Sequence, residues 1–514
     1  MRTRGQVPGS VWALSSGILS SLAFPPVGLA PLVFVAPLPL LWALEQGRTV
    51  TLRRSFLLGW IAAAAHFVIV LHWILWLPNE ELTIPGLMIP ALLFMAGYLA
   101  VFFGIAAALA VWIRRRLLLP LGVVWAVVVT LADLARSIGV LGFPWGSAAY
   151  ALEAMTPVLQ FTATTGFWGL AFWVALCGGL AYETLTHRGA GRFATAVLTA
   201  LLLIGPWLQG TFVLHRAPTD RVGGVEGLRL VLIQPNTSRE IKWDPAFREI
   251  VVEDLLDRTR RAGEHSPDLI IWPETAAPIL LLQEPRYRAR VEETVASLGI
   301  PLLAGTLDHR LEDGRAVSHN SAALFGREGK VVERYDKQHL VPFSERMPYQ
   351  ETVPWINALN FGQSDFTPGS GPVLFAVGGT RLGCLICFES IFPDLARTFA
   401  AAGARILVNI TNDFWFGDTA APVQHAEMAI FRAVETRLPL VRCANTGVSM
   451  VVDPWGRVSN RTATFVEAMI DVRVVPSSGE TFYVRHGEWV ARALLALSGA
   501  LIAAAVLRSW RRRG

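Results

Sequence analysis

Three residues in the second half of the chain have side chains that could together perform covalent acyl transfer. Glu274 stands in Trp-Pro-Glu-Thr, Lys337 in Tyr-Asp-Lys-Gln-His and Cys387 in Leu-Ile-Cys-Phe-Glu. A free thiol has a pKa of about 8.5 and needs a neighbouring base or cation to become a ready nucleophile, and a glutamate with a lysine supplies both. The pattern therefore predicts a site in which Cys387 attacks a carbonyl carbon.

Each of the three residues has a simpler interpretation when it is considered alone. Most glutamates and lysines are solvated surface residues, and a cysteine at the end of an apolar strand is most often a small buried hydrophobe. The ordered set favours chemistry, because each residue lies next to a predicted turn in one domain, and reactive groups are commonly displayed at strand ends.

The composition of the whole chain indicates a membrane protein with one sizeable globular domain. Of its 514 residues, 53% are hydrophobic, and the mean hydropathy is +0.44, which excludes an ordinary soluble enzyme. The net charge of +5 comes largely from short arginine clusters beside apolar runs. This distribution indicates orientation in a membrane, and we expect no nucleic-acid partner.

Eight apolar stretches are candidates for membrane spans, which need about 20 residues each. They cover residues 11–27, 29–45, 55–76, 88–113, 118–135, 160–183, 193–213 and 488–508. The first two stretches are separated by a single residue, which favours a hairpin that stays in the protein over a cleaved signal peptide. The sequence thus predicts about eight transmembrane helices, seven within residues 1–213 and one within residues 488–514.

Arginines collect in alternate loops between these stretches, as the positive-inside rule requires of cytoplasmic loops. The basic positions are Arg2, Arg4, Arg48, Arg53, Arg54, Arg114 to Arg116, Arg188, Arg192 and Arg511 to Arg513, whereas the opposite loops contain Glu80, Glu81 and Arg136. Both termini are then expected in the cytoplasm, with residues 214–487 outside. Asp133 and Arg136, one helical turn apart near the outer end of the fifth span, are expected to form a structural pair.

Residues 225–480 show short strands that alternate with amphipathic helices, a pattern typical of a layered α/β domain. Predicted strands cover 228–235, 267–272, 301–307, 319–325, 372–377, 382–388, 405–411 and 447–452, and predicted helices cover 244–262, 285–298 and 422–437. Paired strands with helices outside favour a sandwich over a barrel.

Other chemistry-bearing patterns are weaker. Cys384 and Cys387 form a Cys-x-x-Cys pair, but redox motifs of that kind open a helix, whereas this pair lies in a strand-like run. The histidines at 339, 425 and 486 are scattered without metal-ligand spacing, and no phosphate-binding glycine loop is present. We expect no metal and no dissociable cofactor.

The order and contexts of Glu274, Lys337 and Cys387 resemble the catalytic triad of the nitrilase superfamily. The whole chain is similar to the apolipoprotein N-acyltransferase family, whose members are bacterial inner-membrane enzymes with eight spans and a periplasmic nitrilase-like α-β-β-α sandwich domain before the last span. The shared motifs are Ala23-Phe24-Pro25-Pro26, Gly142-Phe143-Pro144-Trp145, Lys242-Trp243-Asp244-Pro245, Leu340-Val341-Pro342-Phe343-Ser344-Glu345 and Asn412-Asp413-Phe414-Trp415-Phe416-Gly417.

The resemblance implies a role for each residue of the triad. Cys387 would be the nucleophile, Lys337 the oxyanion stabiliser and Glu274 the general base and acid. One departure is Phe388, where the family usually has tyrosine, although a backbone N–H at this position can serve an oxyanion whatever the side chain. Glu345 and Glu389 are expected to support the site, for which the simpler alternative is a surface ion pair.

Several aromatic residues are candidates for substrate binding or gating. Trp243, Trp415 and Phe416 would fit an acyl-chain wall or a gating loop, and core or interfacial packing is an equally good interpretation. The segment 347–368 contains Trp355 and Phe361 among polar and glycine residues, which favours a lid near the bilayer.

The family resemblance implies that a phospholipid donates an acyl chain to the N-terminal diacylglyceryl-cysteine of an apolipoprotein, by ping-pong transfer through a thioester. The family suggests phosphatidylethanolamine as donor. A membrane-anchored nitrilase-like amidase or hydrolase would use the same three residues and pass the acyl group to water. A transporter or receptor would form no covalent intermediate, and its paired, broken spans are not evident in this sequence.

Overall fold

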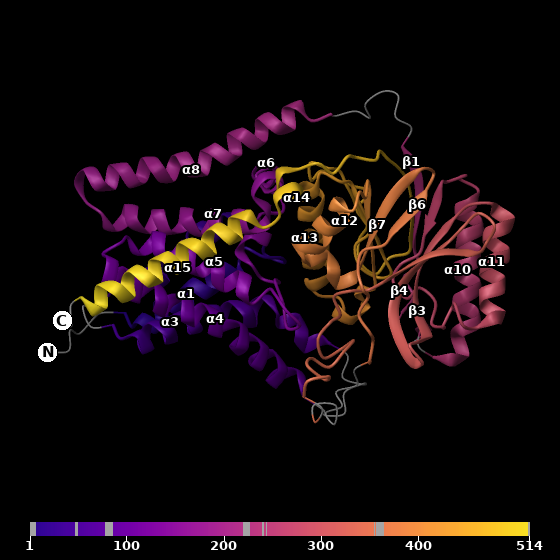
Figure 1. The fold of residues 1–514 in the computed structure, drawn as a ribbon, viewed down its shortest axis with the longest axis horizontal. Coiled ribbons are helices and arrows are strands. Elements are labelled where there is room, and N and C mark those ends of the chain that lie inside the picture. Colours follow the sequence, from indigo (N-terminus) through magenta and orange to yellow (C-terminus); the bar gives the residue numbers. More distant parts are fainter. Residues whose placement is uncertain are drawn as a thin grey trace. The chain divides into compact units, whose positions relative to one another are not determined.

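The computed structural model describes residues 7–46, 50–77, 86–218, 227–238, 241–242, 244–353, 355 and 364–511. The chain divides into two compact units. The first comprises Met1–Trp76, Gly86–His215 and Glu488–Gly514, and the second comprises Leu77–Pro85 and Arg216–Gly487. Helices make up the first unit, and a layered α/β structure makes up the second (Figure 1).

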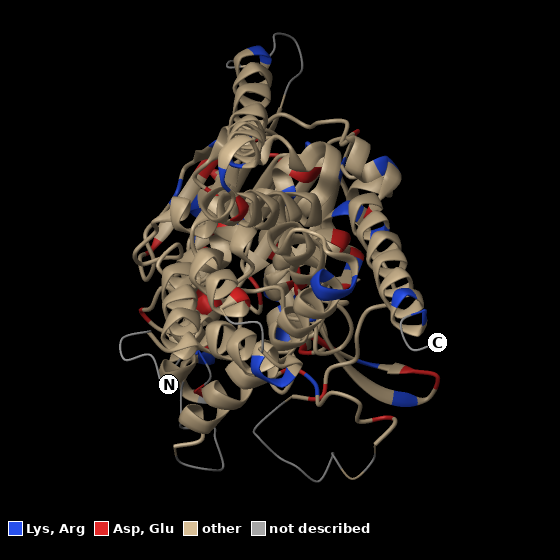
Figure 2. Cartoon of the chain, turned by 90° about the vertical axis from the view of Figure 1, so that its left-hand side faces the viewer, with Lys and Arg blue, Asp and Glu red and all other residues tan. Residues whose placement is uncertain are grey.

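Five helices of the first unit are long and apolar enough to cross a membrane. They are α3 (Leu52–Val70), α4 (Met88–Leu117), α7 (Thr162–Thr186), α8 (Gly189–Arg216) and α15 (Trp489–Trp510). Charged residues are sparse along them and lie toward helix ends, as at the end of α4, which carries Arg114, Arg115 and Arg116 (Figure 2). These helices fit the predicted membrane bundle.

Three of the eight expected spans are shorter helices. The first, second and fifth correspond to α1 (Gly9–Ser21), α2 (Pro37–Glu45) and α5 (Leu121–Ala135). Prolines lie at the ends of these three helices, where the missing backbone donor favours an interruption, although α8 accommodates Pro206 in its interior. Prolines follow α1, begin α2 and precede α5. The described residues thus contain five helices of crossing length where eight were expected.

Asp133 and Arg136 form a buried pair at the end of α5. The guanidinium donates to Asp133 Oδ1 at 2.7 Å and to the main-chain oxygen of Trp145 at 2.9 Å, and it also contacts the oxygens of Phe143 and Pro144. The pair therefore holds the loop after α5 in place, which agrees with the predicted structural role.

The second unit consists of two six-stranded sheets with helices outside them (Figure 1). The first sheet has the order β12-β1-β2-β3-β4-β5, formed by Ala468–Val474, Leu228–Gln234, Leu269–Ile271, Leu302–Glu312, Arg315–Phe325 and Val331–Asp336. The second has the order β11-β10-β9-β8-β7-β6, formed by Val458–Ser459, Met450–Val452, Leu440–Ala444, Ile406–Thr411, Thr380–Ile386 and Leu374–Val377.

Helices cover the outer face of each sheet, which confirms the predicted α-β-β-α sandwich. α10 (Arg248–Gly263) and α11 (Pro285–Leu298) lie outside the first sheet, and α12 (Pro393–Ala401) and α13 (Ala421–Thr436) outside the second (Figure 1). Strands β1, β2 and β3 are parallel, as are β7, β8 and β9. Strands β2, β8 and β9 are buried along their whole length, as expected for parallel strands covered on both faces.

The predicted elements differ from the structure in several places. Strand β3 continues to Glu312 and β4 begins at Arg315, and helix α12 was not predicted. Strand β7 ends at Ile386, so Cys387 begins a turn, and α10 starts at Arg248 because Asp244 Oδ1 accepts from Ala246 N at 2.8 Å in a preceding 3-10 turn. Strands β9, β11 and β12 were not predicted. β12 pairs with β1 across most of the domain sequence, a long-range contact that no local pattern reveals.

Candidate active site

The three predicted catalytic residues meet where strands of both sheets end. Glu274 follows β2 by three residues, Lys337 follows β5 directly, and Cys387 follows β7 as the first residue of the 3-10 turn η6 (Cys387–Ile391). Glu274 and Lys337 are buried, and Cys387 is partly exposed. Glu274 and Lys337 both interact electrostatically with the Cys387 thiol. The fold thus gathers the three side chains in one place.

Three donors hold the carboxylate of Glu274. Its Oε2 accepts the backbone N–H of Asn412 at 2.8 Å, and its Oε1 accepts Asn320 Nδ2 at 2.8 Å and lies 3.5 Å from Lys337 Nζ. A buried carboxylate with such partners has a fixed orientation and a charge that the neighbouring cation offsets. Glu274 is therefore positioned to exchange protons rather than to lie at the surface.

Glu345 fixes the position and the charge of Lys337. Its Oε1 lies 2.9 Å from Lys337 Nζ and also accepts Asn320 Nδ2 at 2.8 Å, while its Oε2 accepts Val341 N at 2.8 Å. Burial alone would lower the pKa of Lys337, but Glu345 and Glu274 more than offset it, so the pKa is raised above its usual value. The lysine is therefore a permanent cation, held in place by Glu345.

The Cys387 thiol is neutral in the resting site. Burial, followed by the charge of Glu274, raises the pKa of this thiol, and the opposing effect of Lys337 is smaller. A thiolate at Cys387 would therefore require proton transfer to a base, and Glu274 is a neighbouring group that could accept the proton.

This protonation state predicts how Cys387 reacts with iodoacetamide. Because only the thiolate is alkylated, the rate should rise by about tenfold per pH unit from pH 6 to pH 9 without a plateau. Intact-mass measurement of the single adduct at each pH provides the rate. A plateau below pH 8 would instead reveal a preformed thiolate.

Glu389 connects, through hydrogen bonds, the segment after Lys337 to the end of β7, where the turn η6 that contains Cys387 begins. Its Oε1 accepts Tyr335 Oη at 2.8 Å, Gln338 N at 2.7 Å and His339 N at 3.1 Å, and its Oε2 accepts Ile386 N at 2.7 Å. The residue is fully buried, so the alternative of a surface ion pair is wrong for it. Glu389 supports the site by fixing the backbone on both sides of the catalytic centre.

The ring of Phe388 packs in an aromatic cluster. It lies edge-on to Phe392 with ring centroids 5.1 Å apart, and the ring of His339 is 6.0 Å away. The side chain is buried. The group of Phe388 that could stabilise an oxyanion is therefore its backbone N–H, because the ring is packed in this cluster.

The aromatic residues proposed for substrate binding have different surroundings. Trp415 and Phe416 belong to the 3-10 turn η7 (Asp413–Phe416), which follows β8, the strand beside β7; both are partly exposed, and the Phe416 ring lies edge-on to His425 at 5.9 Å. Trp355 is 69% exposed. Trp243, Phe361 and part of the predicted lid lie outside the described residues.

The structure adds polar residues that the sequence analysis did not assign to the site. Asn320, on β4, bridges the carboxylates of Glu274 and Glu345. Lys242 is fully buried with its Nζ 3.4 Å from Thr275 Oγ1, and burial, partly offset by Glu274, lowers its pKa to about 7. A polar residue inside an apolar strand was the available signal for Asn320, and a lysine beside an aromatic motif was the signal for Lys242.

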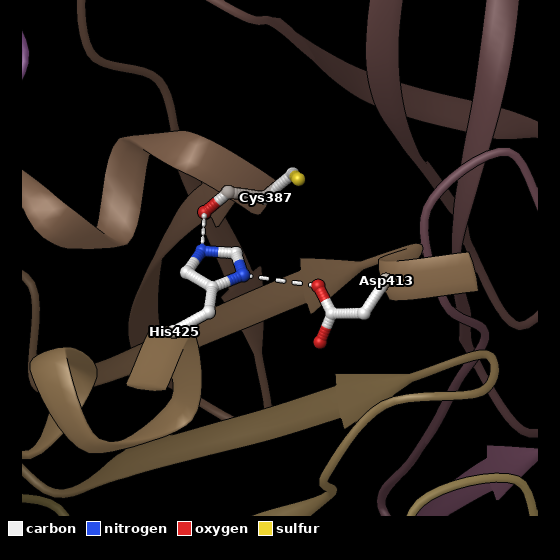
Figure 3. Close-up of side chains that lie close together, drawn as sticks. All are labelled: Cys387, Asp413 and His425. Atoms are coloured by element: carbon white, nitrogen blue, oxygen red, sulfur yellow. Dashed lines mark hydrogen bonds and ion pairs between the residues drawn. The ribbon is translucent and has the colours of Figure 1, made fainter. Parts of the chain in front are cut away.

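A second buried hydrogen-bond network contacts the backbone of the turn η6. Cys387, Asp413 and His425 have donor atoms within 4.8 Å of one another, a spacing that could suit a metal ion (Figure 3). However, His425 already lies between Asp413 Oδ1 at 2.9 Å and the Cys387 carbonyl at 3.2 Å, and Asp413 Oδ2 accepts Arg442 Nη2 at 2.8 Å. The guanidinium already supplies the cation for Asp413, so an internal hydrogen-bond network fits these residues better than a metal site.

Comparison with known proteins covers nearly the whole chain. Residues 16–180 match the apolipoprotein N-acyltransferase N-terminal domain, and residues 233–482 match carbon-nitrogen hydrolase. The apolipoprotein N-acyltransferase of Geobacter metallireducens is 36% identical over 96% of this chain and 94% of its own length, and that of Brucella melitensis is 32% identical over 96% and 94%. A mutant of the Nesterenkonia AN1 amidase from the nitrilase superfamily aligns with 53% of this chain and 99% of its own, at 20% identity and a TM-score of 0.40.

Proposed function

Because this chain belongs to the apolipoprotein N-acyltransferase family, we propose that it transfers an acyl chain from a membrane phospholipid to the α-amine of a diacylglyceryl-cysteine through a thioester on Cys387. The observation that supports this most is the convergence of Glu274 and Lys337 on the Cys387 thiol, in a chain that also has membrane-crossing helices. Membership of an acyltransferase family also excludes a transporter or a receptor without catalysis.

In the first half-reaction, the sulfur of Cys387 attacks the ester carbonyl carbon of the phospholipid. Glu274 takes the thiol proton as the C–S bond forms. The negative charge that develops on the carbonyl oxygen is stabilised by the Lys337 ammonium and the Phe388 N–H. As the C–O bond breaks, Glu274 returns the proton to the departing lysophospholipid oxygen, and a neutral thioester remains on Cys387.

In the second half-reaction, the α-amine of the lipoprotein cysteine attacks the thioester carbonyl. Glu274 accepts a proton from this amine, and the same oxyanion donors act again. The C–S bond breaks, an amide is formed, and the proton returns to the Cys387 sulfur. Because the first product leaves before the second substrate reacts, ping-pong kinetics follow.

The membrane-crossing helices explain why a lipid is the donor. They anchor the catalytic unit at the bacterial inner membrane, where phospholipid is concentrated and where a dry site would protect a thioester from water. Phosphatidylethanolamine is the donor that we propose, and the diacylglyceryl-cysteine of an apolipoprotein is the acceptor. A single anchoring helix would be enough for a hydrolase, so the five long helices favour transfer between two lipid substrates.

The competing hydrolase is distinguished by the product. The purified protein would be incubated in detergent with phosphatidylethanolamine that carries a labelled acyl chain, together with a diacylglyceryl-cysteinyl peptide. We expect the label in an amide on the peptide α-amine. Label that appears only as free fatty acid, with the peptide unchanged, would favour the hydrolase and refute the proposed function.

The proposed orientation, with residues 214–487 in the periplasm and both termini in the cytoplasm, predicts the labelling of introduced cysteines. Leu311 is 75% exposed in the β3–β4 hairpin, and Arg511 is exposed after α15. In cells with a permeabilised outer membrane, a membrane-impermeant maleimide should label Leu311→Cys, with Arg511→Cys labelled only after lysis. Labelling of the unsubstituted protein is the background, and the reverse pattern would contradict this orientation.

A further inference from the structure

Helix α13 contacts both ends of the turn that carries the nucleophile. His425 Nε2 lies 3.2 Å from the Cys387 carbonyl oxygen, and Arg432 Nη1 donates to the Ile391 carbonyl oxygen at 3.1 Å. These two carbonyls belong to the first and last residues of η6. Figure 3 shows the His425 ring between the Cys387 carbonyl and Asp413, with the sulfur directed away from the ring. The hydrogen-bond contact of His425 with Cys387 is therefore to the backbone carbonyl, although a ring nitrogen also lies within 4.8 Å of the sulfur.

The contact with Cys387 requires a proton on His425 Nε2, because a carbonyl oxygen can only accept. The other ring nitrogen, Nδ1, lies 2.9 Å from Asp413 Oδ1 and 3.1 Å from Arg442 Nη2. It donates to the carboxylate when the ring is charged and accepts from the guanidinium when the ring is neutral. Ser390 Oγ also lies 3.2 Å from Nε2, but it donates its single proton to the Cys387 carbonyl at 3.0 Å, which leaves Nε2 as a donor. His425 and Ser390 thus hold this carbonyl together, with Asn409 Nδ2 3.5 Å from it.

The groups behind the ring are completely buried. Asp413, His425 and Arg442 all have no exposed surface, and Thr411 Oγ1 donates to Asp413 Oδ1 at 2.8 Å. Burial would raise the pKa of Asp413, but Arg442 and His425 more than offset it, so its pKa lies well below the usual value. Buried charges are costly to desolvate and are retained where they fix a geometry. Here they fix the orientation of one imidazole ring.

The backbone that the ring contacts is in a conformation that needs support. Cys387 has φ of +50°, in the left-handed region that is strained for a non-glycine residue. The Cys387 carbonyl and the Phe388 N–H belong to one planar peptide unit and point in opposite directions. A hydrogen bond that holds this carbonyl toward His425 therefore directs the Phe388 N–H away from His425.

We propose that His425 is a positioning residue that holds the peptide between Cys387 and Phe388, so that the sulfur and the Phe388 N–H act on the same carbonyl group. This inference rests on the proposed roles of Cys387 and Phe388. Asp413 and Arg442 act through His425 by fixing its ring. None of the three transfers a proton to or from substrate.

Two amide substitutions separate this role from a purely structural one. The amide nitrogen of His425→Gln can occupy the place of Nε2 and donate to the Cys387 carbonyl, whereas that of His425→Asn reaches only the place of Nδ1. Acyl-enzyme formation from phosphatidylethanolamine, followed by intact mass in a single turnover, should be about 100-fold slower in His425→Asn and within about tenfold of wild type in His425→Gln. Alkylation of Cys387 by iodoacetamide should change by less than about threefold in both, because Glu274, Lys337 and Asp413, the charged groups that act on the thiol pKa, stay in place.

The matched control is His265→Asn, an exposed histidine that pairs with Asp471 at 2.9 Å, which should acylate like wild type. Equal acylation rates in the two His425 variants, or a slower rate in His425→Gln, would overturn the proposal. Failure of both variants to fold would also overturn it, because His425 would then be a stability residue. Absence of an adduct on wild type would refute the proposed function instead, so the two failures are distinguishable.

Discussion

Cys387→Ala is expected to lower the rate of N-acylation by at least about 10⁴-fold, because the proposed pathway has no other group that can form the covalent intermediate. Among the residues that the structure describes, Cys387 is the one cysteine at a strand end whose thiol pKa is affected by both Glu274 and Lys337. Thermal unfolding of the variant should remain close to that of wild type, because Cys387 is partly exposed and truncating its side chain opens no enclosed cavity. Initial rates with phospholipid and a diacylglyceryl-cysteinyl peptide provide the measurement.

Cys384→Ala is the matched control for this prediction. Cys384 lies three residues earlier in β7, is fully buried and belongs to the second sheet. Its replacement removes a thiol from the same strand and should leave the rate within about threefold of wild type, at a stability cost of about 1 kcal/mol from the lost packing. Comparable losses of activity in both variants would mean that strand integrity, and not the Cys387 thiol, limits the reaction.

Lys337→Met is expected to reduce both catalysis and stability. Removal of the ammonium takes away one oxyanion donor, which lowers kcat by about 10²–10³-fold. It also leaves the carboxylates of Glu274 and Glu345 buried without their shared cation, a change that costs about 3–5 kcal/mol of unfolding free energy. Initial rates and thermal unfolding, measured on the same preparation, test the two effects separately.

Lys330→Met provides the comparison for Lys337→Met. Lys330 is also near β5 and pairs with Glu292 at 2.5 Å, but its side chain is 70% exposed. An exposed ion pair contributes about 0–1 kcal/mol, so this substitution should be nearly silent in both measurements. If Lys337→Met retained wild-type activity, Lys337 could not be the group that stabilises the oxyanion.

The sequence was sufficient to locate the three candidate catalytic residues next to strand ends and to predict most strands of the second unit. Glu274, Lys337 and Cys387 each follow an apolar or alternating run and a turn, so local patterns placed them at strand ends. Parallel strands then bring such ends to a common edge of each sheet. Family resemblance supplied the roles, and the structure supports the proximity that those roles require.

The residues behind the triad could not be predicted, because their partners are distant in sequence. Asn320 contacts Glu274 across 46 positions, and Asn412 contacts it across 138. His425 is on α13 and reaches the Cys387 carbonyl across 38 positions. Local periodicity reports which face of an element is buried, but it does not report what a buried polar group will meet.

The helical unit shows a different limit of sequence analysis. Hydropathy identified every region that forms an apolar helix, including those of α1, α2 and α5. It overestimated their length, because hydropathy does not register the prolines that border these helices, and whether a proline ends a helix or is accommodated, as Pro206 is in α8, depends on its surroundings. The number of crossing-length helices was therefore less predictable than the location of the apolar segments.

The covalent intermediate is the most direct test of this account. Wild-type protein would be incubated with phosphatidylethanolamine alone and denatured at mildly acidic pH, and its intact mass would be compared with that of Cys387→Ala. We expect wild type alone to gain the mass of one acyl chain, which hydroxylamine removes and a diacylglyceryl-cysteinyl peptide discharges as an N-acyl product. Formation of the N-acyl peptide with no adduct on Cys387 at any time would contradict the thioester pathway.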